Sequence, residues 1–131
     1  WKSKNRHKYL LQYHIIFVCK YRKKLLMSKQ ISDDIKQFSY EICQKHKVII
    51  RYMETDKDHI HYMIETEPTM SISKIVNLMK SYTTYHIWKR YPDYLRKHFL
   101  KEHTFWTDGY FVCSVGNVSE EMLRKYIENQ G

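Results

Sequence analysis

Two histidines separated by one residue, His59 and His61, are the first candidates for chemistry in this sequence. They begin a run, 59–66, whose residue types are typical of a β-strand. Because alternate residues of a strand point to the same face, both imidazoles would lie together and could bind one divalent ion. A carboxylate from the preceding loop, Asp56 or Asp58, would orient a ligand imidazole through a hydrogen bond. The alternative is that both histidines are ordinary surface or packing residues.

A tyrosine and a glutamine near the end of the chain, Tyr126 and Gln130, form a second pair. They are four residues apart and therefore lie on the same face of a predicted helix. A tyrosine hydroxyl can act as a covalent nucleophile, and a neighbouring metal ion would stabilise charge on a phosphoryl oxygen under attack. The alternative is a tyrosine that only packs at a helix end. Periodicity does not distinguish Tyr126 from the other tyrosines, since the chain has 12 in all.

The segments that would position these residues have readable patterns. Alternating apolar residues predict four strands, at about 9–19, 48–55, 59–66 and 110–115. Helical spacing predicts three helices, at about 32–45, 71–92 and 119–130. We expect Ser32 and Ser119 to cap the first and third helices, Ser71 or Ser73 to begin the second, and Pro92 to end it. Residues 93–109 have a mixed pattern.

The predicted order of elements is β-α-β-β-α-β followed by a C-terminal helix that carries the tyrosine. This is the split β-α-β arrangement of ferredoxin-like and RNA-recognition-type folds, an α+β class with an antiparallel sheet and two helices on one face. A chain of 131 residues with 3 glycines and 2 prolines is expected to form one compact domain over residues 1–131. The fold alone does not assign a function.

Positive charge is concentrated at the start of the chain. The 23 basic and 14 acidic residues give a net charge of +9, and the whole excess arises in residues 1–32, which contain no acidic residue. This favours a polyanionic partner, and nucleic acid is preferred to a membrane surface because the segment alternates like a strand. The residues expected to bind DNA phosphates are Arg6, Lys8, Lys20, Arg22, Lys23 and Lys24. A solvated basic face is the alternative for any single lysine.

Basic and aromatic residues are interleaved a second time, over residues 80–101. The basic members are Lys80, Lys89, Arg90, Arg96, Lys97 and Lys101. The aromatic members are Tyr82, Tyr85, Trp88, Tyr91 and Tyr94. Charges and rings together would suit unstacked bases, although about half of the aromatic residues are expected to pack in the core of the second helix.

Composition excludes several classes of protein. The apolar runs are far shorter than the roughly 20 residues of a transmembrane helix, and no signal peptide is visible. The three cysteines lie far apart with no Cys-x-x-Cys pair, which argues against a disulfide framework or a thiolate zinc site and favours the cytoplasm. No Gly-rich phosphate loop is present, so nucleoside triphosphate chemistry is not expected.

Four ordered segments resemble the single-tyrosine HUH transposases encoded by small insertion sequences that move as single-stranded DNA. The segments are 13–24 (YHIIFVCKYRKK), 59–61 (HIH), 106–112 (WTDGYFV) and 126–130 (YIENQ), and the resemblance covers nearly the whole chain. The resemblance implies that His59, His61 and Gln130 bind a divalent metal ion, Mg²⁺ or Mn²⁺, and that Tyr126 is the nucleophile.

The resemblance also implies a mechanism and partners. Tyr126 would attack a phosphodiester of single-stranded DNA, leaving a 5′-phosphotyrosine and a free 3′-hydroxyl that later reverses the reaction on another strand. Members of the family are homodimers with joined sheets, in which the tyrosine helix of one subunit completes the histidine site of the other. They bind DNA hairpins at the ends of the element.

Other interpretations stay open. A related HUH nicking enzyme, or an enzyme that processes repeated hairpins, would use the same residues on a different substrate. A non-catalytic hairpin-binding module would share the fold and charge but would be indifferent to metal and to loss of Tyr126. A structural metal protein is disfavoured because two histidines without cysteines make a poor closed zinc site.

Overall fold

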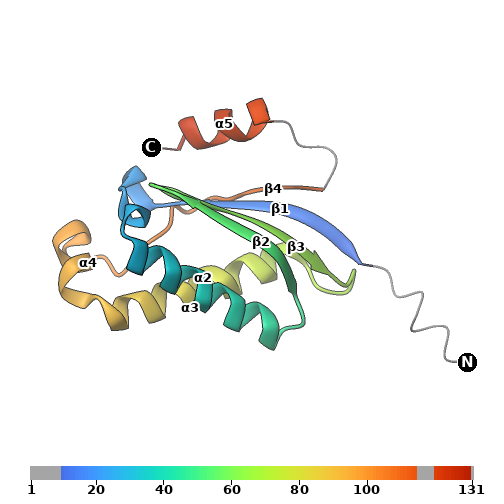
Figure 1. Ribbon diagram of the computed structural model, residues 1–131, viewed down its shortest axis with the longest axis horizontal. Coiled ribbons are helices and arrows are strands. Elements are labelled where there is room, and N and C mark those ends of the chain that lie inside the picture. The colour runs from blue at the N-terminus through green and yellow to red at the C-terminus, as the bar shows by residue number, and fades with distance from the viewer. Residues whose placement is uncertain (1–9, 115–119, 131) are drawn as a thin grey trace, which may run out of the picture.

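The computed structural model describes residues 10–114 and 120–130, which form a four-stranded antiparallel sheet with helices on both faces (Figure 1). The sheet order is β2-β3-β1-β4, made by β1 (Leu11–Val18), β2 (Ile49–Asp56), β3 (His59–Thr66) and β4 (Phe111–Ser114). The helices are α2 (Lys29–Lys45), α3 (Ile72–Arg90), α4 (Pro92–Phe99) and α5 (Glu120–Glu128). Two short 3-10 turns, η1 (Lys20–Arg22) and η2 (Leu25–Met27), follow β1. The predicted α+β class and β-α-β-β-α-β order are confirmed.

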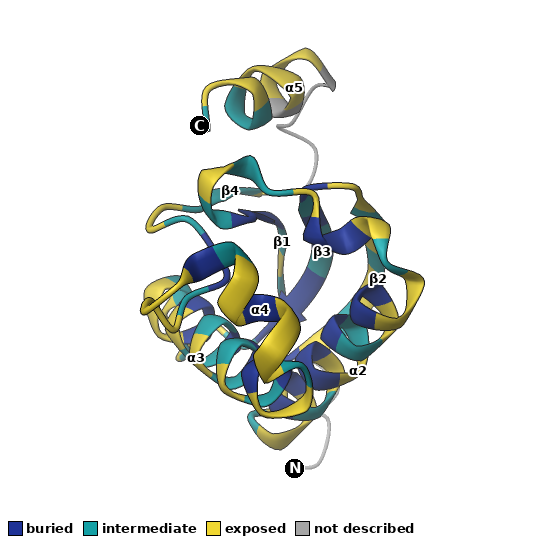
Figure 2. Ribbon diagram, turned by 90° about the vertical axis from the view of Figure 1, so that its left-hand side faces the viewer, coloured by how far each residue is buried: buried dark blue, intermediate teal, exposed yellow. Residues whose placement is uncertain are grey.

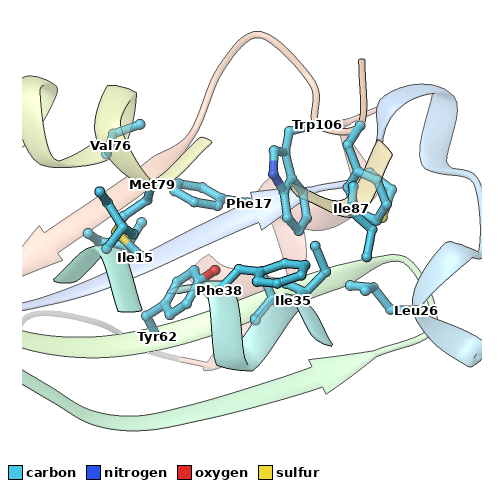
Figure 3. Close-up of a cluster of buried hydrophobic side chains, with 14 of the residues drawn as sticks. Ile15, Phe17, Leu26, Ile35, Phe38, Tyr62, Val76, Met79, Ile87 and Trp106 are labelled. Atoms are coloured by element: carbon cyan, nitrogen blue, oxygen red, sulfur yellow. The ribbon is translucent and has the colours of Figure 1, made fainter. Parts of the chain in front are cut away.

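The core lies between the sheet and the pair of helices α2 and α3 (Figure 3). Alternate residues of β1 and β3 enter it and are fully buried: Ile15, Phe17, Ile60, Tyr62 and Ile64. Removing such a side chain from water contributes about 1.5–3 kcal/mol. The one polar atom among these side chains is satisfied, because the Tyr62 hydroxyl lies 2.7 Å from the Ser39 hydroxyl, which donates to the Ile35 carbonyl at 2.8 Å.

The other face of the sheet carries the intervening residues of the same strands, and we call it the open face. Pairing of β1 with β3 places Ile16 opposite His61 and His14 opposite Met63. Pairing of β2 with β3 places Asp56 opposite His59. Helix α5 lies over this face, on the side away from α2 and α3 (Figure 1). The surface of α5 is largely exposed, in contrast to the buried inner sides of α2 and α3 (Figure 2).

The start of α2 differs from the prediction. The helix begins at Lys29 and its N-cap is Ser28, whose hydroxyl accepts a hydrogen bond from the Ile31 amide at 3.2 Å. The prediction that Ser32 caps this helix was wrong. Ser32 lies inside the helix, buried, with its hydroxyl 2.7 Å from that of Thr55. The helix starts one turn earlier because Ile31 is already part of the core.

The segment after α3 was predicted only as mixed and forms a further helix. Helix α3 ends at Arg90, as the predicted stop at Pro92 requires, but Pro92 then begins α4. Proline is favourable at the first position of a helix, where its missing amide hydrogen costs nothing. Buried Leu95 and Phe99 attach α4 to the core. The predicted cap of the last helix, Ser119, lies outside the described residues.

Candidate active site

His59 is held by a buried carboxylate at the turn between β2 and β3. Its Nδ1 lies 2.9 Å from Oδ1 of Asp58, whose side chain is 5% exposed. Burial opposes ionisation of Asp58, but hydrogen bonds from His59 and Arg22 outweigh it and lower the pKa of this carboxyl group. Since an ionised carboxylate can only accept, Nδ1 of His59 carries the proton. In the neutral imidazole Nε2 is then the unprotonated nitrogen, which could bind a metal ion, and the predicted hydrogen bond to a loop carboxylate is present.

His61 lies on the same open face and contacts a residue that the sequence did not indicate. Its Nε2 is 2.8 Å from Nδ1 of His14, which comes from β1. The pKa of His61 is lowered, first by burial and then by the nearby imidazoles of His14 and His59, with Glu54 acting in the opposite direction, and burial also lowers the pKa of His14. Both rings are thus favoured in the neutral form, in which one nitrogen donates to the other. Only the alternation of β1, combined with its pairing to β3, could have placed His14 here.

A groove of about 430 Å³ joins the two histidines to the last turn of α5. His59 and His61 line one side of it together with Asp56 and Asp58, and α5 contributes Ile127 to the opposite side. The other lining residues are Ile16, Arg22, Lys57, Arg124 and Glu128. The structure therefore brings the histidine pair and the tyrosine helix together.

Tyr126 does not line this groove. Its ring faces β4, with its centroid 5.4 Å from that of Phe111, and a methyl group on Gly109 would stand 4.0 Å from its hydroxyl oxygen. The hydroxyl is buried and has no hydrogen-bond partner among the described residues. Burial raises the pKa of Tyr126. In this arrangement burial favours the neutral phenol, which packs beside Phe111 and Gly109 rather than lining the histidine groove.

Gln130 follows the end of α5, and its backbone amide donates to the carbonyl of Ile127 at 3.2 Å. It does not line the groove. Within the described ranges, no group of three or more His, Cys, Asp or Glu residues is close enough to hold a metal ion. Imidazole is a ligand type that suits a divalent ion, but two histidines alone need completion by another kind of ligand, such as an amide or a phosphate oxygen.

The predicted DNA-binding residues of the first basic segment differ in exposure and in their ion pairs. Arg6 and Lys8 lie outside the described residues. Lys20 is 3.5 Å from the exposed carboxylate of Asp108, and Arg22 pairs with Asp58 at 3.3 Å. Among the described members, Lys24 is exposed and Lys23 is partly exposed.

The second basic and aromatic segment is divided between packing and surface, as expected. Trp88 is buried, whereas Tyr85 is 60% exposed. Tyr85, Trp88, Lys89 and Arg96 line a groove of about 690 Å³ beside α3 and α4. The ring of Trp88 stacks on that of His103 with centroids 4.2 Å apart. This groove combines cations with ring surface, but it is separate from the histidine groove.

The resembling segment 106–112 forms a turn that leads into β4. The ammonium group of Lys80 lies 2.7 Å from the carbonyl oxygens of Thr107 and Gly109 and 3.1 Å from that of Asp108. Trp106 anchors the start of the turn, since its Nε1 donates to the buried Thr83 hydroxyl at 3.0 Å. The start of the turn is therefore built into the core, while its exposed tip at Gly109 lies next to the Tyr126 hydroxyl.

Comparison with known proteins agrees with this fold and arrangement. The family model "Transposase IS200 like" matches residues 7–130. The ISDra2 transposase TnpA of Deinococcus radiodurans is 27% identical over 122 residues, which cover 93% of this chain and 85% of that protein. The transposase for insertion sequence element IS200 of Salmonella typhimurium is 28% identical over 129 residues, covering 98% and 82%.

Two solved structures have the same fold. A crystal structure assigned as a transposase from Deinococcus radiodurans superposes with a TM-score of 0.84 at 24% identity, covering 93% of this chain and 92% of the other. A REP-associated tyrosine transposase bound to a REP hairpin gives a TM-score of 0.57 at 12% identity, covering 92% and 64%.

The fold and the match over almost the entire chain define a transposase of the single-tyrosine type. The chain belongs to the IS200-like transposase family, and it is a DNA transposase. None of the helices in the described ranges has the length and apolar character that crossing a membrane requires.

Proposed function

We propose that the protein cleaves and rejoins single-stranded DNA at the ends of an insertion sequence through a 5′-phosphotyrosine on Tyr126. The observation that carries this proposal is the groove in which His59 and His61 face the last turn of the tyrosine helix. Asp58 supports it, because this carboxylate leaves Nε2 of His59 free for a ligand.

His59, His61 and Gln130 would hold Mg²⁺ or Mn²⁺. When bound, such an ion supplies positive charge that stabilises the phosphoryl oxygens under attack. The lowered pKa of His61 supports this assignment, because a metal ligand must be unprotonated. Neutral histidine and glutamine ligands also leave open positions that DNA oxygens could fill.

The chemical step is an exchange of esters. The phenolic oxygen of Tyr126 forms a bond to phosphorus and the bond from phosphorus to the 3′ oxygen breaks. The phenol proton is lost, and the leaving 3′ oxygen gains one. The phosphoryl group stays on the 5′ side, bound to Tyr126, and the free 3′-hydroxyl reverses the exchange on another strand. One phosphodiester replaces another, so the reaction needs no nucleoside triphosphate.

We propose a homodimer with joined sheets, in which α5 of one subunit completes the histidine groove of the other. The position of Tyr126 supports this, because within its own subunit the hydroxyl meets Gly109 rather than the groove. The proposed substrate is single-stranded DNA with hairpins at the element ends, contacted by Lys23 and Lys24. A transposase of the same fold, solved with a REP hairpin, supports this class of substrate. The proposed location is the cytoplasm.

A second candidate function is the processing of repeated hairpins rather than transposition of an element. The likeness in fold to the REP-associated transposase favours it. Both functions share the covalent step, so a strand-transfer assay with an element end and a target strand distinguishes them: joining to the target supports transposition, and cleavage alone supports hairpin processing.

The covalent step is tested by mixing the protein and Mg²⁺ or Mn²⁺ with labelled single strands that tile the DNA beside its gene. A denaturing gel then detects protein bound covalently to DNA. We expect an adduct that requires metal and single-stranded substrate, and that Tyr126→Phe abolishes while still binding DNA. Binding to the tiles without any adduct would refute the enzymatic proposal in favour of a binding module.

A further inference from the structure

Arg22 occupies a backbone conformation that a non-glycine residue adopts only when its surroundings impose it. In the turn η1, Tyr21 and Arg22 have φ angles of 60° and 53°, both in the left-handed region. This conformation is unfavourable for side chains with a Cβ, and it is concentrated at functional sites. The turn is held by the Arg22 amide, which donates to the Cys19 carbonyl at 2.8 Å, and by the Tyr21 hydroxyl, which donates to Glu102 at 2.9 Å.

From this turn the guanidinium group of Arg22 reaches both Asp58, next to His59, and the end of helix α5. Nε of Arg22 is 3.3 Å from Oδ2 of Asp58, while the other oxygen of the same carboxylate binds His59. Nη1 of Arg22 is 3.4 Å from the backbone carbonyl of Glu128, the last residue of α5. Carbonyls at the end of a helix lack partners within the helix and carry partial negative charge, so a cation is favourable there.

We propose that Arg22 is a positioning residue that joins the histidine site to the tyrosine helix of the same subunit, in the single-chain arrangement described above. Through Asp58 it fixes the orientation of His59, and through Glu128 it fixes the last turn of α5, beside the residues Tyr126 and Gln130. The part of this proposal that concerns metal rests on the proposed use of His59 as a ligand.

Geometry favours this role over the phosphate contact that the sequence predicted for Arg22. Its side chain is 35% exposed, and two of its nitrogens are directed at groups of the protein. The backbone of Asp58 is fixed separately, because its carbonyl accepts from the Cys19 amide at 2.8 Å, so Arg22 acts on the carboxylate. A planar guanidinium group can donate hydrogen bonds to two acceptors at once in a fixed geometry, whereas a lysine ammonium group has no such rigid arrangement of donors.

The test compares Arg22→Ala with Arg51→Ala. Arg51 is a matched control, since its guanidinium also pairs with a carboxylate on the sheet, Glu65, at 2.7 Å, outside the histidine groove. Long-range ¹H–¹⁵N correlation spectra of the metal-free protein report which nitrogen of His59 carries the proton. We expect Nδ1–H in the wild type and in Arg51→Ala, and a shift towards Nε2–H in Arg22→Ala.

Hydrogen exchange and metal binding provide two further readouts. Loss of a cation at a helix end is expected to speed exchange of the α5 amides by about two- to five-fold. Titration with Mn²⁺ is expected to show an affinity about 10-fold lower in Arg22→Ala, typical for loss of support behind a ligand histidine. If Arg22→Ala does not fold, Arg22→Lys keeps the charge without the fork and is put through the same measurements.

A double-mutant cycle shows whether Arg22 acts on the metal site through Asp58. Arg22→Ala combined with Asp58→Asn should bind Mn²⁺ no more weakly than Asp58→Asn alone, because the two residues form one chain of contacts. Additive losses would overturn the proposal. So would an unchanged His59 tautomer and unchanged exchange in Arg22→Ala. If the tautomer and exchange respond but the wild type binds no Mn²⁺, the positioning role is supported and the proposed metal site fails.

Discussion

Lys80 supports the turn against which the tyrosine packs, and its removal should be costly. Its ammonium group contacts three successive carbonyl oxygens, those of residues 107–109, at 2.7, 3.1 and 2.7 Å. It also lies 5.5 Å from the ring centroid of Phe17 and 5.8 Å from that of Tyr110. Lys80→Met keeps most of the aliphatic chain and removes only the charge and the donors, so it isolates these contacts.

The magnitude follows from what each carbonyl loses. A hydrogen bond to a charged group contributes about 1.5–3 kcal/mol, and three independent bonds would exceed 4 kcal/mol. We expect a smaller loss for two reasons. Burial disfavours the charged form of Lys80 and lowers its pKa. In addition, Asp108 and Gly109 are exposed, so their carbonyls can bind water when the ammonium group is removed. We therefore expect a loss of about 2–3 kcal/mol in the free energy of unfolding, or about 6–12 °C in Tm.

Thermal and urea unfolding monitored by circular dichroism measure this loss. Lys74→Met is the matched control, because Lys74 is an exposed lysine on the same helix. The control should change the free energy of unfolding by less than about 0.5 kcal/mol. A Lys80→Met protein as stable as the control would show that the hydrogen bonds from the ammonium group to the three carbonyls do not stabilise the fold, which would refute the proposed role of Lys80.

His61→Ala should abolish formation of the covalent adduct with little change in Tm, because His61 lies on the open face outside the core; a large fall in Tm would instead support a packing role. Replacing Lys23 and Lys24 with Ala should weaken DNA binding and reduce the slope of log affinity against log salt by roughly 1–2, and an unchanged slope would place the DNA elsewhere. Hydrogen bonds from Arg51 and Gln12 lower the pKa of Glu65, so its contribution to stability is present at neutral pH and lost as the pH falls through that lowered pKa. The difference in Tm between wild type and Glu65→Gln should therefore shrink between about pH 6 and pH 3, and a constant difference would contradict this.

Local periodicity accounts for what the sequence predicted correctly. The alternation of β3 separates the buried Ile60, Tyr62 and Ile64 from the histidines on the open face, and both sets are as expected. Asp58 precedes His59 directly, so its hydrogen bond to the imidazole was within reach of sequence reasoning. These features depend on residues that are neighbours along the chain.

The contacts that sequence reasoning missed join distant segments. His14 meets His61 only because β1 and β3 pair in a particular register, which the pattern of neither strand specifies. Arg22 and Lys24 look alike as members of a basic run, yet one pairs with a buried carboxylate and the other is exposed. Arg22 has a left-handed backbone and Lys24 does not. Because neither Arg22 nor its neighbour Tyr21 is a glycine, composition gave no signal for this conformation.

Titration of Tyr126 would show whether the proposed nucleophile is buried in the protein alone. Its hydroxyl is buried against the turn at Gly109 with no hydrogen-bond partner among the described residues, and burial raises its pKa. Because a buried phenolate is disfavoured, this hydroxyl should remain protonated at a pH where exposed tyrosines, with pKa values near about 10, have ionised.

Labelling the tyrosine Cζ with ¹³C allows each phenol to be titrated by NMR, and Tyr126→Phe identifies the resonance. We expect the Tyr126 signal in the protein alone to titrate above the usual range of a solvated tyrosine. The proposed reaction requires the hydroxyl to leave this position and lose its proton, so addition of Mn²⁺-free Mg²⁺ and single-stranded substrate should move the resonance. A Tyr126 that titrates in the usual range of a solvated tyrosine would show that the hydroxyl is exposed to water, and the reason for placing its active position in another subunit's groove would be lost.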